Sequence, residues 1–205
     1  VTSLAISPEK NIVAAGDYSG QIMIMDSLGT IMGSFQTHSD VITDLEFYPE
    51  GNGLFSSGMD GKIYFTELSD LNNNILVGEQ RKPFRSLTLN DYGSYLLAAG
   101  DNSRITRWKI LPGNLFVEDS NIKSKGWVLS VDYYSDNFTF AEGTSNGFTK
   151  IHTNLDIDYQ TSLPGPVNKI HIFSRKDEKL YLLASLFNKG LVLVPAEYMN
   201  TRKSY

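Results

Sequence analysis

Large apolar residues alternate with polar or small residues in short runs along the whole chain. Five runs place apolar side chains at about every second position: "VTSLAIS" from Val1, "VITDLEF" from Val41, "FRSLTLN" from Phe84, "WVLSVDY" from Trp127 and "VNKIHIF" from Val167. A period of two is typical of a β-strand that buries one face. Because no segment shows a convincing helical period, the pattern predicts an all-β fold.

Each run is followed by the same succession of features. A turn-rich patch leads to a second apolar strand such as "LFSSG" or "YLLAAG", then to a glycine-type turn, a third strand and a looser fourth stretch. The residues in the equivalent turn slot are separated by 41, 42, 44 and 43 residues: Gly20, Gly61, Ser103, Gly147 and Gly190. This period indicates a repeated unit of about four short antiparallel strands.

A lone sheet of this size would leave one face in water, whereas sheets stacked around an axis bury both faces. The repeat therefore predicts a β-propeller of four-stranded antiparallel blades. About five blades are visible, with approximate limits 1–40, 41–83, 84–126, 127–166 and 167–198. Since Val1 stands inside an expected strand, we expect residues 1–205 to be one propeller or part of one, from a longer protein.

Composition narrows the functional classes. Hydrophobic residues make up 41% and charged residues 20% of the chain, which is typical of a globular protein. The net charge of −5 gives no general attraction to phosphate backbones or anionic membranes. The chain has no cysteine, which excludes disulfides and thiolate metal sites and fits an intracellular protein, nuclear or cytoplasmic. No apolar run of about 18 residues predicts a membrane span.

Residues 37–67, "THSDVITDLEFYPEGNGLFSSGMDGKIYFTE", resemble a WD repeat. His38 stands in the histidine slot and Asp60-Gly61 makes the second turn, while Thr66-Glu67 replaces the closing Trp-Asp. The other copies match in part. In this family, a His, an Asp, a Ser or Thr and a Trp of one blade can form a hydrogen-bonded set that braces it. The resemblance therefore implies four bracing residues: His38, Ser57 (or its neighbour Ser56), Asp60 and Trp108.

The sequence offers no catalytic constellation. The three histidines, His38, His152 and His171, have no companion motif, and no nucleophile elbow, zinc-protease motif, P-loop or dinucleotide fingerprint is present. We therefore expect that the protein is not an enzyme. We also expect no catalytic, metal-binding or cofactor-binding residues, no cofactor and no small-molecule substrate.

The family resemblance implies that partners bind mainly to the loops between second and third strands and to the loops between blades. Two further positions attract attention. Arg107 occupies a slot that is apolar in the other copies, and Tyr134 belongs to a tyrosine pair beside two aspartates. The candidate partner-binding residues are Tyr18, Met59, Asn102, Arg104, Arg107, Tyr134, Ser145 and Asn188.

The leading functional hypothesis is a non-catalytic scaffold for protein–protein interaction, a propeller subunit of a larger eukaryotic multiprotein complex. The alternative is an RNA-associated propeller in a ribonucleoprotein or ribosome-assembly particle. There, "RITRWK" at 104–109, Lys123 and Lys125 would contact RNA. The competing interpretation is that 104–109 is an ordinary third strand whose tryptophan packs between blades. In that case a buried Arg107 needs a partner for its charge.

Overall fold

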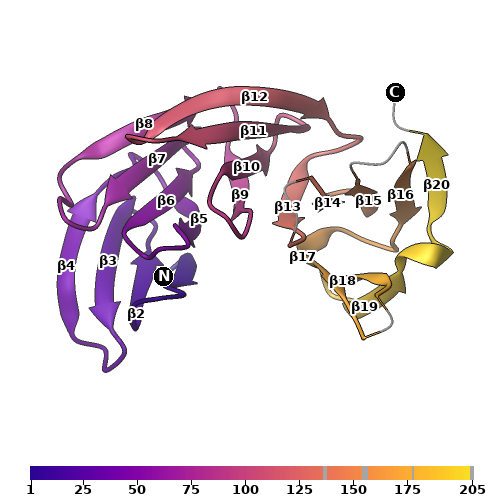
Figure 1. The fold of residues 1–205 in the computed structure, drawn as a ribbon, viewed down its shortest axis with the longest axis horizontal. Helices are drawn as coiled ribbons and strands as arrows, with labels where there is room; N and C mark the ends of the chain where they lie inside the picture. Colours follow the sequence, from indigo (N-terminus) through magenta and orange to yellow (C-terminus); the bar gives the residue numbers. More distant parts are fainter. Residues whose placement is uncertain (136–137, 154–156, 177, 204–205) are drawn as a thin grey trace. The chain divides into compact units, whose positions relative to one another are not determined.

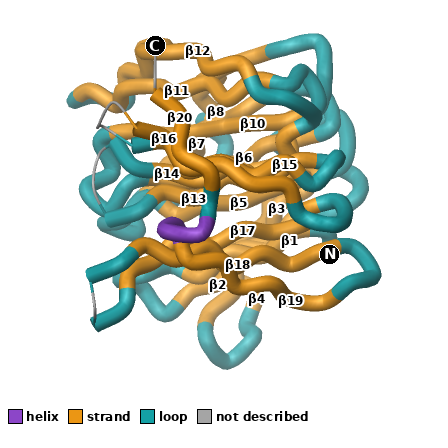
Figure 2. The backbone as a smooth tube through the Cα atoms, turned by 90° about the vertical axis from the view of Figure 1, so that its right-hand side faces the viewer, coloured by secondary structure: helices purple, strands orange, loops and turns teal. Residues whose placement is uncertain are grey.

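The computed structural model describes residues 1–135, 138–153, 157–176 and 178–203. Strands occupy most of these residues (Figure 2). The single helical segment among the described residues is one short 3-10 turn, η1 (Ala196–Tyr198). The predicted all-β class is confirmed.

The chain divides into two compact units, Val1–Leu87 and Thr88–Tyr205. The first unit contains two four-stranded antiparallel sheets whose strands are neighbours in chain order (Figure 1). The strands of the first sheet are β1 (Ser3–Ile6), β2 (Ile12–Gly16), β3 (Gln21–Asp26) and β4 (Ile31–Gln36). Those of the second sheet are β5 (Ile42–Phe47), β6 (Gly53–Gly58), β7 (Lys62–Glu67) and β8 (Asn74–Glu79).

Three further sheets follow, beginning with β9, which runs from the end of the first unit into the second. The third sheet contains β9 (Phe84–Leu89), β10 (Tyr95–Gly100), β11 (Arg104–Leu111) and β12 (Leu115–Lys123). The fourth contains β13 (Val128–Tyr133), β14 (Phe140–Thr144), β15 (Phe148–His152), β16 (Ile157–Ser162) and β20 (Asn200–Lys203). The fifth contains β17 (Val167–Ser174), β18 (Leu180–Leu186) and β19 (Gly190–Pro195). The predicted succession of five antiparallel sheets is confirmed, while the exact limits of the blades stay a prediction.

The fifth sheet departs from the four-strand pattern. It has three strands, and the chain after β19 passes through η1 to form β20 on the edge of β16. Pro195 has no N–H to donate to a ladder and ends β19, which redirects the chain. Ile157 then pairs with Lys203 and Gln160 with Asn200, so the fourth sheet gains a fifth strand.

The repeated turn shares one backbone feature in all five copies. The five residues assigned to its slot all have positive φ: Gly20 (84°), Gly61 (76°), Ser103 (57°), Gly147 (83°) and Gly190 (80°). A Cβ at Gly20 would lie 2.1 Å from the carbonyl oxygen of His38, and one at Gly61 would lie 2.2 Å from that of Gln80. Glycine is therefore required at these two turns by space as well as by conformation. The repeat read from the sequence is confirmed.

Apolar side chains pack between neighbouring sheets inside each unit. In the first unit, Ile22 and Ile24 of β3 share a buried cluster with Leu45 of β5 and Leu54 of β6. In the second unit, one cluster joins β10 and β11 to β13 and β14, and another joins β14 and β15 to β17 and β18. Each of these sheets thus buries at least one face against its neighbour, while loop residues such as Tyr18 and Leu28 are exposed.

Candidate functional site

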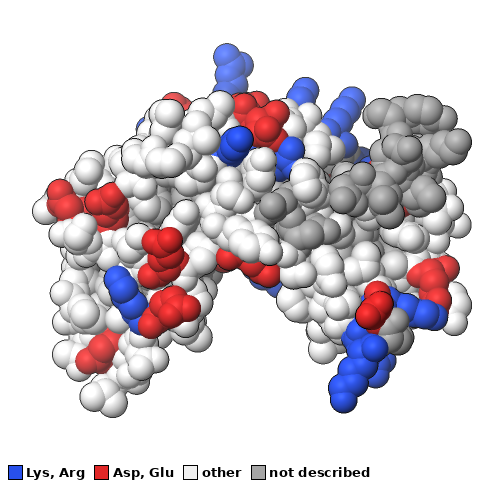
Figure 3. All heavy atoms as spheres, viewed as in Figure 1, with Lys and Arg blue, Asp and Glu red and all other residues white. Residues whose placement is uncertain are grey.

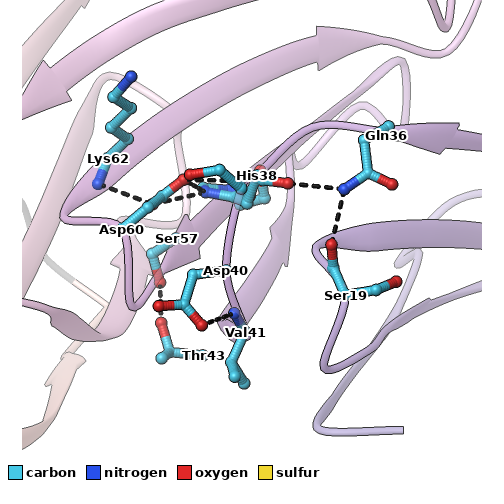
Figure 4. A network of polar contacts seen from close by, with 11 residues as sticks. Ser19, Gln36, His38, Asp40, Val41, Thr43, Ser57, Asp60 and Lys62 are labelled. Atoms are coloured by element: carbon cyan, nitrogen blue, oxygen red, sulfur yellow. Dashed lines mark hydrogen bonds and ion pairs between the residues drawn. The ribbon is translucent and has the colours of Figure 1, made fainter.

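A buried hydrogen-bonded network surrounds His38 in the second sheet (Figure 4). The Nδ1 atom of His38 lies 3.0 and 3.1 Å from the two carboxylate oxygens of Asp60, and Nε2 lies 2.9 Å from the Ser56 Oγ. Burial lowers the pKa of His38, and hydrogen bonding to Asp60 offsets this effect in part. The neutral imidazole therefore donates its Nδ1–H to Asp60, which can only accept, and Nε2 accepts the Ser56 hydroxyl proton.

Asp60 ties the segment before β5 to the turn between β6 and β7. Its carboxylate also accepts the backbone N–H groups of Ser39 and Lys62, both at 3.1 Å. The ring of Tyr64 lies edge-on to His38, with 5.1 Å between the ring centroids. Gly58 leaves room for the network, because a Cβ there would lie 2.6 Å from His38 Nδ1. The arrangement fixes a connecting loop to its sheet.

The serine that contacts His38 is Ser56, the alternative that the prediction gave beside Ser57. Successive side chains of a strand point to opposite faces, so only one of two adjacent serines can reach the histidine. Ser57 instead exchanges a hydrogen bond with Thr43, with 2.9 Å between the two hydroxyl oxygens. Trp108 lies in β11 with 5% of its surface exposed, and its bracing role stays a prediction.

Ser56, His38 and Asp60 are connected in the order of a Ser-His-Asp catalytic triad. Their surroundings differ from an active site, because His38 is 2% exposed and Ser56 1% exposed. A substrate cannot reach the serine oxygen in this conformation. The hydrogen bonds join the segment before β5 to β6 and to the β6–β7 turn, and a bracing role for His38 and Asp60 stays a prediction.

The other two histidines also pair with carboxylates. His152 Nε2 lies 3.2 Å from a carboxylate oxygen of the buried Glu142, and the imidazole stacks on Phe140. His171 Nδ1 lies 2.8 Å from Asp132, whose pKa is raised by burial. No group of three or more His, Asp or Glu side chains within the described ranges is arranged to hold a metal ion.

The turns between second and third strands are held by side-chain to backbone hydrogen bonds. Asp17 Oδ1 accepts the hydroxyl and N–H of Ser19 at 2.8 Å and the N–H of Gln21 at 3.0 Å. The Ser19 hydroxyl and the Gln21 N–H lower the pKa of Asp17. Equivalent Asx turns join Asn102 to the Arg104 N–H and Asn146 to the Phe148 N–H, at 3.0 and 3.2 Å. These turns are preorganised by their own side chains.

Most of the predicted partner-binding residues lie on these turns. Tyr18 and Met59 belong to the first unit, where Tyr18 is 75% exposed and Met59 is partly exposed. In the second unit, exposed or partly exposed positions are occupied by Asn102, Arg104, Ser145 and Asn188. Their role in binding stays a prediction.

Arg107 and Tyr134 have partners inside the second unit. The Nε atom of Arg107 lies 2.6 Å from an Asp119 carboxylate oxygen, and its guanidinium lies over the ring of Tyr95. Asp119 on β12 therefore provides the negative charge that balances Arg107, which stands at a position that is apolar in the other copies. The Tyr134 hydroxyl donates to the Ser174 Oγ at 3.0 Å. Both side chains are partly exposed, and both have a hydrogen-bond partner within the second unit.

Trp127 is an exposed aromatic residue that the sequence analysis placed at the start of a strand. The strand β13 begins one residue later, at the fully buried Val128, and Trp127 is 55% exposed. The carbonyl oxygen of Trp127 accepts the Ser145 N–H at 2.9 Å, which holds it against the β14–β15 turn. In the sequence, Lys123, Lys125 and Trp127 stand at every second position, which is the signal that could have revealed it.

Comparison with known proteins supports the repeat. The family model "WD domain, G-beta repeat" matches residues 29–66, which include His38, Ser56 and Asp60. The resemblance to WD repeats is confirmed for this segment. Separately, among the described residues no helix is long and apolar enough to cross a membrane.

Two curated proteins resemble larger parts of the chain. It is 22% identical over 149 residues to "Pre-mRNA-processing factor 19" of Caenorhabditis elegans, a match to 72% of this chain and 30% of that protein. It is 26% identical over 110 residues to "U3 small nucleolar RNA-associated protein 4 homolog" of Homo sapiens, a match to 54% of this chain and 16% of that protein. The chain thus spans less than a third of the length of either relative.

Proposed function

Starting from the WD repeat at residues 29–66, we propose that this protein is a non-catalytic scaffold, an intracellular subunit of a larger multiprotein complex. The names of the two relatives, a pre-mRNA-processing factor and a small nucleolar RNA-associated protein, support a place in RNA-handling machinery. Their sources support a eukaryotic complex. We also propose that residues 1–205 form one propeller or part of one.

The proposal rests mainly on the turns between second and third strands, which are held by hydrogen bonds from their own side chains. The Asp17, Asn102 and Asn146 side chains fix their own turns, and the exposed Tyr18 and the partly exposed Ser145 stand on two of these turns. A partner that meets a preordered surface loses less conformational entropy on binding than one that must order a mobile loop. Binding residues on loops positioned by a rigid scaffold are a common arrangement.

The non-catalytic part of the proposal is supported by the burial of the Ser56–His38–Asp60 network. An assay with activated ester substrates tests it. We expect no turnover above the buffer rate for the wild-type chain or for Ser56→Ala. Ester hydrolysis that disappears in a folded Ser56→Ala variant would overturn this assignment.

Co-purification with matched surface variants tests the scaffold role. Tyr18 lies on the β2–β3 turn and is 75% exposed, whereas Leu28 lies on the β3–β4 turn at the opposite end of the strands and is 89% exposed. We expect wild-type protein to retain a defined, stoichiometric set of proteins. Tyr18→Ser should lose at least one of them and Leu28→Ser should lose none. Equal loss in both variants, or no stoichiometric partner for the wild type, would refute the proposal.

RNA association is the second candidate function, supported by the names of both relatives. The structure limits how the 104–109 strand could take part. Arg107 is paired with Asp119 and Trp108 is buried, which leaves Arg104 and Lys109 with exposed charges. A contact with RNA therefore needs further residues near one of these two cations.

A further inference from the structure

The two units differ in charge. Val1–Leu87 contains five Lys or Arg against eleven Asp or Glu, whereas Thr88–Tyr205 contains thirteen against twelve. The net charge of −5 therefore belongs to the first unit, and the second is close to neutral. Figure 3 shows Lys and Arg side chains along the edge where β11 and β12 lie. An anionic ligand would meet less repulsion at the second unit.

A like-charged pair stands at the end of the β11–β12 hairpin. Arg104, the first residue of β11, pairs directly with Lys123, the last residue of β12. In the second sheet, the corresponding pair of first and last residues is Lys62 and Glu79, which carry opposite charges. Like charges directly opposite each other in an antiparallel pair are destabilising. The third sheet thus places two cations opposite each other where the second sheet places opposite charges.

A second exposed lysine and an exposed tryptophan follow Lys123 in the chain. Lys123, Lys125 and Trp127 are exposed, whereas Ser124 and Val128 between and after them are buried. The chain bends at Lys125 and Gly126. Two exposed cations and an exposed aromatic ring therefore follow one another within five residues.

This segment is fixed from both sides. The Ser124 N–H donates to the Ser103 carbonyl oxygen at 2.9 Å, and the Asn146 amide donates to the Lys125 carbonyl oxygen at 3.1 Å. The Trp127 carbonyl oxygen accepts the Ser145 N–H at 2.9 Å. Three hydrogen bonds from two turns thus hold residues 124–127 in one conformation, which reduces the entropy that a ligand must overcome.

Among the described residues, no carboxylate neutralises the cations of this surface. Arg104 Nη1 donates to the neutral Asn121 side chain at 2.9 Å, and Lys125 Nζ lies 4.5 Å from the centroid of the Phe148 ring. No ion pair joins Arg104, Lys123 or Lys125 to a carboxylate in the part of the chain that the structure describes. Their charge is available to an external anion.

We propose that Arg104, Lys123, Lys125 and Trp127, here called the basic strip, bind single-stranded RNA. This inference rests on RNA association, the second candidate function. The three cations would contact successive phosphates, and the exposed indole would stack on a base. A row of cations along a segment suits a repeating polyanion better than a single phosphate group. The adjacent aromatic ring favours a nucleic acid over a phosphorylated peptide.

Fluorescence anisotropy with a labelled 12-nucleotide oligouridylate tests the basic strip. We expect Lys123→Glu to weaken binding at least tenfold and Trp127→Ala to weaken it about tenfold, the latter from the usual worth of base–aromatic stacking. Lys123→Ala should reduce the slope of log affinity against log salt by about 0.7. Lys109→Glu is the matched control, because it makes the same charge change on an exposed residue near the other end of β11. It should leave affinity within twofold.

The two tryptophans of the chain give a second readout. Trp108 is 5% exposed and Trp127 is 55% exposed, so a stacked base should quench the fluorescence of Trp127 alone. Oligouridylate should quench the wild-type emission and leave Trp127→Phe unchanged. Lys123→Glu should also unfold at a higher denaturant midpoint than wild type, because Arg104 then faces an opposite charge. This gain separates lost binding from lost folding.

The outcomes are distinct. Equal weakening by Lys109→Glu and Lys123→Glu, or binding without quenching of Trp127, would refute the basic strip as the site. Tighter binding of a phosphoserine peptide than of oligouridylate would overturn RNA as the ligand. Absence of RNA binding by the wild type at low salt would remove both the strip and the second candidate function. The scaffold role has its own test in the Tyr18 and Leu28 variants.

Discussion

Gly58→Ala is the sharpest test of the His38 network. Gly58 is the last residue of β6, and a Cβ at this position would lie 2.6 Å from His38 Nδ1 and 2.7 Å from Asp60 Oδ1. Both distances are well below the 3.4–4 Å of ordinary contact. The backbone of Gly58 does not have a positive φ, so alanine introduces no conformational strain of its own. The substitution therefore acts through the lack of space between two hydrogen-bonded groups.

The expected loss of stability can be assembled from three terms. Overpacking a buried site costs about 1–3 kcal/mol, and separating His38 from the Asp60 carboxylate costs about 1.5–3 kcal/mol. Replacing glycine restricts the unfolded chain and returns about 0.4–1 kcal/mol. His38 is 2% exposed and cannot move into solvent without losing Ser56 as well. We expect a net loss of about 3.5 kcal/mol, the sum of the midpoints of these terms.

Urea unfolding measured by circular dichroism gives the stability, and the NMR signal of the protected His38 Nδ1–H reports the hydrogen bond. Gly58→Ala should lower the urea midpoint and remove this signal. Gly165→Ala is the control, since its Cβ would lie 3.7 Å from Lys189 and its φ is not positive; it should change stability by less than about 0.5 kcal/mol. A Gly58→Ala variant with the wild-type midpoint and an intact Nδ1–H signal would refute the reasoning.

Three further predictions concern ionisable groups. Because the pKa of His38 is lowered, the unfolded chain binds more protons below about pH 6.5, so wild-type stability should fall between pH 7 and 5 more steeply than that of His38→Gln in urea titrations. Arg107→Met should cost about 0.5–1 kcal/mol at low salt, and less in 1 M NaCl, because its ion pair with Asp119 is partly exposed. Although burial opposes it, the Lys150 ammonium 2.6 Å away lowers the pKa of Asp158. Asp158→Asn should cost about 1–2 kcal/mol at pH 7, and the difference from wild type should shrink as the pH falls below about 4.

The repeat was predictable because glycine recurs at the same position of its turns. Four of the five turn slots hold glycine, since a positive φ at Gly20 or Gly61 excludes most other residues. The strands around them alternate because one face is buried. His38 and Asp60 were also predictable, because each has its own place in the WD repeat.

Contacts that depend on register were not predictable. A bulge between Ile42 and Asp44 shifts β5 against β6, and two adjacent serines look alike in sequence, so Ser56 and Ser57 could not be separated. A bulge at Arg107 and Trp108 shifts β12 in the same way, which hid Asp119 as the partner of Arg107. The strand β20 was missed because the "NTRK" segment is short and polar, with no alternation to mark it.

Ser103 has a consequence for local opening of the structure. It adopts the left-handed conformation that glycine adopts at the other four turns, and this costs an L-residue about 1–2 kcal/mol. The β10–β11 hairpin should therefore unzip from its tip more often than its counterparts, and its turn amides should exchange hydrogen with deuterium sooner. The Ser103 carbonyl oxygen also accepts the Ser124 N–H, so each opening frees the start of the 124–127 segment. The conformation of a single turn residue thus affects how often that segment loses one of its three anchoring hydrogen bonds.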